Sequence, residues 1–129
     1  MAIAATSLPK NFRKVIVVLA REPGHPDGAA DDRYTLVVPL AADGHVSSDD
    51  VRTHAEVCRV ISEREGDRLI GHLNQDEGGV WRTVFDIEGD APDETWFRLA
   101  DERLETGEYI SLDRDNGQHT FKIIAVTEL

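Results

Sequence analysis

The chain has 129 residues, of which 40% are hydrophobic and 30% are charged, and its net charge is −11. This length suits a single domain that buries its own core, and the composition excludes a disordered chain. The negative charge repels phosphate backbones and anionic lipid headgroups, so we expect neither a nucleic acid nor a membrane as a partner.

Three features of the sequence indicate the cellular compartment. The single cysteine, Cys58, permits no intramolecular disulfide. The first residues carry no basic and apolar leader pattern, and the longest apolar run, residues 15–20, is too short to span a bilayer. We therefore expect a cytoplasmic protein, and the preference for arginine over lysine suits a bacterial genome rich in G and C.

The N-terminal third of the chain predicts two strands. Residues 1–12 are expected to be a loose tail, and residues 13–129 a single β-rich domain. Residues 13–20 are rich in valine, isoleucine and leucine and too few for a helix, which indicates a buried strand. Prolines and glycines between residues 22 and 32 predict a long loop, and residues 34–40 are a second predicted strand.

A helix is predicted to begin at Ser47, because Ser47 and Asp50 approximate a capping box. Two interpretations of the following segment are open. Either the helix continues to residue 64, or it stops near residue 57 and residues 58–64 form a strand. We favour the strand, because a turn at residues 65–66 and a return over residues 67–74 would place opposite charges across the hairpin in two pairs, Arg64 with Asp67 and Glu63 with Arg68.

The C-terminal half of the chain predicts further strands over residues 80–87, 94–99, 109–115 and 118–126. Pairing residues 67–74 with residues 80–87 would set Leu73 beside Trp81. Asn116-Gly117 is the preferred pair for a type I′ turn, with positive φ at Gly117 and Leu112 opposite Phe121. The expected fold is mainly β, a small antiparallel barrel or sandwich with one short helix. The alternative is an α+β fold with one longer helix over residues 48–64.

The sequence contains no catalytic, phosphate-binding or metal-binding motif that stands above chance. His54 and Cys58 are four residues apart, which on a helix would place them on one face, but two ligands do not make a zinc site. A buried structural thiol is the simpler explanation of Cys58. We therefore expect no catalytic residue, no metal and no cofactor.

One constellation of residues depends on the predicted strand pairing. Arg59, His72 and Arg82 would lie abreast on the face opposite Leu73 and Trp81. Below them would lie an apolar floor made of Ile61, Ile70 and Val84. A row of cations over an apolar floor suits an amphipathic anion, because the guanidinium fork matches carboxylate or phosphate oxygens. The alternative is a solvated sheet face whose arginines pair with the surplus acids.

The sequence does not state a function, and three hypotheses follow from it. The leading hypothesis is a non-catalytic binding domain that holds a small anionic ligand or a partner protein. The second is a small enzyme in which His72 is the acid or base and Arg59 and Arg82 clamp an anion. The third is a structural subunit that forms homo-oligomers through an apolar sheet face.

Overall fold

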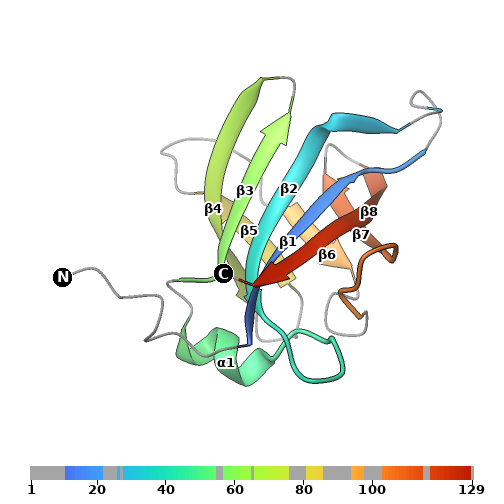
Figure 1. Ribbon diagram of the computed structural model, residues 1–129. Coiled ribbons are helices and arrows are strands. Elements are labelled where there is room, and N and C mark those ends of the chain that lie inside the picture. The colour runs from blue at the N-terminus through green and yellow to red at the C-terminus, as the bar shows by residue number, and fades with distance from the viewer. Residues whose placement is uncertain are drawn as a thin grey trace.

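The computed structural model describes residues 11–21, 26, 28–54, 57–64, 66–75, 81–85, 94–97, 103–114 and 117–128. Over these residues, eight antiparallel strands form a closed barrel in which each strand pairs with its neighbours in the chain and β1 also pairs with β8 (Figure 1). The elements are, in order, β1 (Phe12–Leu19), β2 (Ala29–Pro39), α1 (Ser48–Thr53), β3 (Arg59–Arg64), β4 (Asp67–Gln75), β5 (Trp81–Phe85), β6 (Glu94–Phe97), β7 (Tyr109–Arg114) and β8 (Gly117–Glu128).

The structure confirms the expected fold class, a mainly β barrel with one short helix. The alternative with a longer helix is wrong, because α1 ends at Thr53 and Arg59–Arg64 is a strand. The β3–β4 hairpin has the predicted register, with Arg64 opposite Asp67. Ser47 is the N-cap of α1, but its side chain does not cap the helix; its hydroxyl donates to the Asp50 carboxylate at 2.9 Å instead.

Two predicted registers are displaced by two residues. In the β7–β8 hairpin, Arg114 is opposite Gly117 and Leu112 is opposite His119 rather than Phe121, and Asn116 of the predicted turn lies outside the described residues. Gly117 is the first residue of β8. Its φ is not positive, so the prediction of a positive φ at this residue is wrong. In the β4–β5 pair, Leu73 is opposite Thr83 rather than Trp81. A shift of two residues leaves every side chain on its predicted face, so the alternation of apolar residues does not distinguish the two registers.

Two element boundaries also differ from the predictions. β2 begins at Ala29, so the last four residues of the predicted loop over residues 22–32 are strand, and the β1–β2 register shifts between Val18 and Leu19. The predicted tail lies outside the described residues as far as residue 10. Asn11 and Phe12 belong to the barrel, since the side chain of Phe12 is buried and the Asn11 carbonyl accepts the Leu40 N–H.

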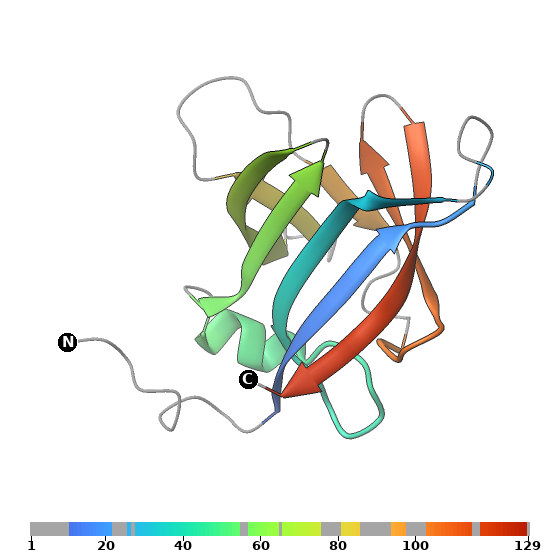
Figure 2. The same ribbon diagram turned by 45° about the horizontal axis from the view of Figure 1, so that its top comes forward.

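The core fills the barrel and continues under the helix. Inward side chains alternate along each strand with outward ones, as the burial of Val15, Val17 and Leu19 on β1 shows. At the end where β1 begins and β8 ends, α1 lies below the barrel (Figure 2). Val51 of α1 and Leu104 of the segment before β7 are buried there with the strands. This end of the barrel is therefore closed by apolar packing.

Candidate functional site

The three residues of the predicted cationic row lie on the outer surface of the barrel. Arg59 is directly opposite His72, as predicted. Arg82 is opposite Asn74, and Val84 takes the place beside His72 that was predicted for Arg82. The prediction of a row of three is therefore wrong. The β4–β5 register moves Arg82 two residues along the strand and keeps it on the same face. Arg59 and Arg82 are exposed and His72 is half-buried.

The predicted apolar floor is correct for Ile61 and Ile70 and wrong for Val84, which lies beside His72, and the row of Ile61 extends onto other strands instead. Ile61 is opposite Ile70 on β4 and opposite Thr35 on β2. Thr35 is opposite Ile16 on β1, and Ile16 is opposite Ala125 on β8. One row without charges thus crosses the outer surface of five adjacent strands, which Figure 1 shows side by side.

Basic residues dominate the two rows on either side of this apolar row. We call the three rows together the basic face. On one side lie Lys122, Val18, Arg33, Glu63 and Arg68. On the other side lie Thr127, Lys14, Val37, Arg59, His72 and Val84. The basic face carries five lysines and arginines against one acidic residue, whereas the whole chain has 14 basic and 25 acidic residues.

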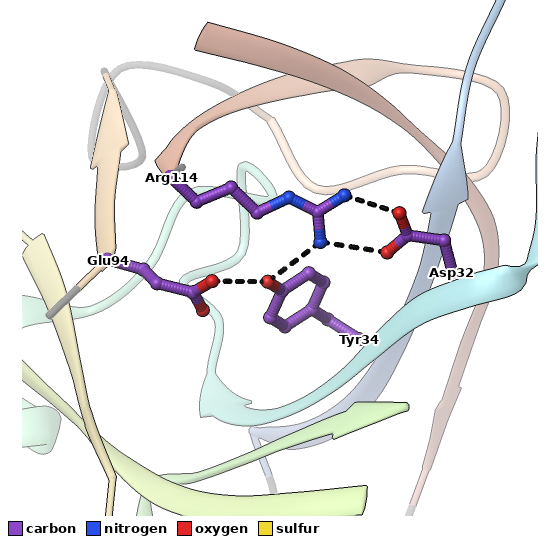
Figure 3. Close-up of polar contacts among 4 residues, drawn as sticks. All are labelled: Asp32, Tyr34, Glu94 and Arg114. Atoms are coloured by element: carbon purple, nitrogen blue, oxygen red, sulfur yellow. Dashed lines mark hydrogen bonds and ion pairs between the residues drawn. The ribbon is translucent and has the colours of Figure 1, made fainter. Parts of the chain in front are cut away.

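A second cluster, which the sequence analysis missed, lies inside the barrel near its other end. Arg114 of β7 forms a bidentate ion pair with Asp32 of β2, with Nη1 donating to Oδ1 at 2.8 Å and Nη2 donating to Oδ2. The same Nη1 donates to the Tyr34 hydroxyl at 3.1 Å, and that hydroxyl donates to Glu94 Oε2 at 2.7 Å (Figure 3). The four side chains thus form one chain of hydrogen bonds from β7 through β2 to β6.

Aromatic rings enclose this buried chain. The Arg114 guanidinium lies 5.0 Å from the centre of the Phe121 ring and 5.7 Å from that of Tyr34. Tyr34 makes edge contacts with Trp96 and with Phe121. Burial, and then the nearby charge of Glu94, raise the pKa of Tyr34 well above its ordinary value of 10. Tyr34 therefore stays a neutral hydroxyl that can both accept from Arg114 and donate to Glu94.

The buried chain is built to hold the barrel together. Burial alone would lower the pKa of Arg114, but hydrogen bonds to Asp32 and the neighbouring Tyr34 outweigh it and the pKa is raised. The guanidinium is thus a permanent cation, and its fork is already occupied by a carboxylate. Hydrogen bonds between buried polar groups of this kind lock the relative positions of strands. We assign this buried chain of hydrogen-bonded side chains a structural role rather than a catalytic one.

The sequence contained only a weak signal for this cluster. Asp32 and Tyr34 are two residues apart and so lie on the same face of a strand as Leu36. The predicted loop over residues 22–32 removed Asp32 from the strand and hid this relation. Nothing local indicates that Arg114, 82 residues away, is the partner of Asp32.

The remaining candidates do not make a site. The Cys58 thiol is buried and contacts the His54 carbonyl at 3.5 Å, while the His54 ring packs edge-on against Phe12. Within the described ranges, no three histidine, cysteine or acidic side chains converge where they could hold a metal ion. The one helix of that part of the chain is far shorter than a membrane span.

Comparison with known proteins adds no function to this geometry: no protein-family model, no curated protein and no solved structure matches the chain.

Proposed function

We propose that the protein is a non-catalytic binding domain whose basic face recognises an acidic segment of a partner protein. The observation that carries this proposal is the segregation of charge. Five basic side chains gather around one apolar row in a protein whose net charge is −11. A face of this kind attracts an acidic partner by long-range electrostatics and holds it by burying apolar surface.

The apolar row distinguishes a protein segment from a nucleic acid as the partner. Ile70 is 41% exposed, and Ile16 and Ile61 are half-buried, so the row can gain burial on docking. The three rows contain no phenylalanine, tyrosine or tryptophan, the side chains on which the bases of single-stranded nucleic acids stack; Tyr109 lies beyond them on β7, beside Lys122. An extended acidic segment with apolar side chains is complementary to both features.

The predicted Arg59 and His72 are part of this proposal, since both belong to the basic face, and Arg82 lies just beyond it. The enzyme hypothesis loses its geometric basis, because Arg82 does not flank His72. A small anionic ligand remains compatible with the same cations. We place the binding in the bacterial cytoplasm, and the buried Cys58 thiol is compatible with a reducing compartment.

The proposal can be tested with a synthetic heptapeptide, Glu-Glu-Leu-Glu-Leu-Glu-Glu, titrated into the protein and followed by amide NMR shifts. We expect saturable shifts along β1 to β4 that weaken as salt rises. Replacing both leucines with serine should weaken binding, because the apolar row then gains no burial. A single-stranded DNA heptamer serves as the competing ligand class and should bind less tightly than the peptide.

Two matched pairs of substitutions distinguish the effect of the basic face on peptide binding from the effect of net charge. Arg33→Gln with Arg68→Gln should weaken peptide binding by about tenfold or more, since each arginine contributes charge-assisted hydrogen bonds. Arg52→Gln with Arg103→Gln changes net charge equally on exposed residues elsewhere and should leave binding nearly unchanged. Equal effects of both pairs, or no saturable shift, would overturn the proposal. Self-association that only the first pair abolishes would assign the face to a second copy of the chain.

A further inference from the structure

A hollow of about 400 Å³ opens on the barrel surface where the end of β1 meets β7 and β8, and it is separate from the apolar row. This volume falls within the range of small-molecule sites. Its walls come from four segments, at the end of β1, just before β2, at the start of β7 and in β8. The lining residues are Val18, Leu19, Ala20, Arg21, Gly28, Tyr109, Thr120 and Lys122.

Strand pairing holds the lining residues in place. Lys122 on β8 is directly opposite Val18 on one side and Tyr109 on the other. The Ala20 N–H donates to the Thr120 carbonyl at 2.9 Å, so the end of β1 stays attached to β8 at the edge of the hollow. Paired strands therefore form most of the lining, whereas Ala20, Arg21 and Gly28 lie just outside the strands.

Gly28 lies where the start of β2 approaches the end of β1. Its φ is +75°, and a Cβ atom there would lie 2.5 Å from the Leu19 carbonyl oxygen. Any larger residue would push the two backbone segments apart. Glycine at this position thus keeps the start of β2 tight against the end of β1.

The chemistry of the lining is cationic and half apolar. Neither Arg21 nor Lys122 forms an ion pair with any described residue, although the chain has 25 acidic residues. Val18 and the half-exposed Tyr109 ring flank Lys122 and offer apolar surface. Hydroxyl groups of Tyr109 and Thr120 add hydrogen-bonding capacity.

We propose that this hollow is a binding site for a small organic anion with an aromatic or apolar body, such as an aryl phosphate or an aryl carboxylate. The anionic group pairs with Arg21 and Lys122, and the body packs against Val18 and the Tyr109 ring. This proposal is distinct from the docking of an acidic segment on the basic face, because Arg21 and Tyr109 take no part in the three rows, although Val18 and Lys122 belong to both surfaces.

The test is a titration with phenyl phosphate, benzoate, inorganic phosphate and benzyl alcohol, followed by amide NMR shifts. We expect saturable shifts confined to residues 18–21, 109 and 120–122. Phenyl phosphate or benzoate should bind most tightly, because inorganic phosphate lacks the body and benzyl alcohol lacks the charge. The stronger of the two aryl anions identifies the anionic group that the site prefers.

Variants then locate the site. Lys122→Gln and Arg21→Gln should each weaken binding of the preferred aryl anion by about tenfold, as expected for the loss of one charge-assisted contact. Lys14→Gln is the matched control, because Lys14 is an exposed lysine on the same outer face of β1, four residues from Val18. Unaltered folding of each variant is checked by its amide spectrum without ligand.

Three results would overturn the proposal: no saturable shift with either aryl anion, shifts centred outside the hollow, or equal weakening by Lys14→Gln and Lys122→Gln. Binding of the heptapeptide to the basic face is tested separately with the Arg33→Gln and Arg68→Gln substitutions. Loss of one binding activity with retention of the other therefore shows which of the two proposals fails.

Discussion

Gly66 is the last residue of the β3–β4 turn and has a φ of +89°, a backbone region that residues with a Cβ atom avoid. No atom lies within 4 Å of a Cβ built there, so a substitution would meet no steric obstacle besides its own backbone. We expect Gly66→Ala to lower the free energy of unfolding by about 1–2 kcal/mol, the usual cost of a left-handed residue. Urea unfolding followed by tryptophan fluorescence measures this change.

Gly117 is the matched control for this substitution. It lies in β8 without a positive φ, and a Cβ atom would meet only His119 Nε2 at an ordinary 3.7 Å. Gly117→Ala should therefore leave stability within about 0.5 kcal/mol or raise it slightly, because alanine restricts the unfolded chain. A loss at Gly117 as large as that at Gly66 would show that the turn lies at residues 116–117 after all.

Two buried tryptophans differ in one hydrogen bond. Trp96 Nε1 donates to Thr83 Oγ1 at 2.9 Å, whereas the Trp81 indole N–H has no acceptor among the described residues. Both side chains are at most 2% exposed, so replacement by phenylalanine removes similar volume. We expect Trp96→Phe to destabilise the protein by about 1–2 kcal/mol more than Trp81→Phe, because it leaves the Thr83 hydroxyl unpaired.

Adding Thr83→Val to Trp96→Phe provides the internal check on this comparison. With both polar partners removed, part of the lost stability should return, since no buried hydroxyl is left without a partner. Thermal unfolding of the three variants and the natural chain measures the differences. Equal losses for the two tryptophan variants would refute the role of the Trp96–Thr83 bond.

At the scale of elements, α1 is attached to the barrel through its first turn. The Asp50 carboxylate accepts from the Asn11 side-chain amide and from the Ser47 hydroxyl, both at 2.9 Å. The Asn11 bond, and then the Ser47 bond, lower the pKa of Asp50 below its ordinary value of 3.8. A six-residue helix has little stability of its own, so these contacts and the burial of Val51 hold it in place.

The sign of the resulting pH dependence follows from linkage. Because the folded pKa of Asp50 is depressed, its contribution to stability is present above pH 3.8 and is lost as the pH falls through the folded pKa. We expect Asp50→Asn to be less stable than the natural chain at pH 7, and the difference to shrink at about pH 3. Urea midpoints at the two pH values test this.

Asn11→Ala provides the control for the Asp50 measurement. Removing the amide donor should abolish most of the pH-dependent stability that Asp50 contributes, because the Asn11 hydrogen bond is the largest cause of the lowered pKa of Asp50. A difference between Asp50→Asn and the natural chain that is equally large at both pH values would contradict the assignment.

At the scale of the whole molecule, the buried chain through Arg114 connects distant walls of the barrel. β2 and β6 are opposite each other in the ring of eight described strands, and the Tyr34–Glu94 bond joins them. Arg114→Met would leave the Asp32 carboxylate buried without its cation. We expect a loss of about 3–5 kcal/mol, which is a large part of the stability of an ordinary domain.

The double variant Arg114→Met with Asp32→Leu tests whether burial of an uncompensated charge is the cause. Removing both charges should recover most of the stability, since an apolar pair of similar volume costs no desolvation of charge. Guanidinium chloride unfolding, with m-values compared, measures both variants. If the double variant is no more stable than Arg114→Met, packing around the guanidinium, rather than charge, accounts for the loss.

Local patterns in the sequence determined which side chains face inward. The opposite charges of Arg64 and Asp67 around Gly66 predicted the β3–β4 hairpin in its observed register, and with it the pairing of Arg59 with His72. These features depend on neighbouring residues and on a side-chain period of two, so a single sequence carries them.

Only the tertiary structure decided the remaining features. The predicted position of Arg82 failed because a register shift of two residues preserves the alternation of faces. Closure of β8 onto β1 creates the basic face and the hollow, and the partners of the buried chain are 60 to 82 residues apart. Such contacts depend on how all eight described strands close into one ring, which no local pattern specifies, because each strand is compatible with several registers until its two neighbours are in place.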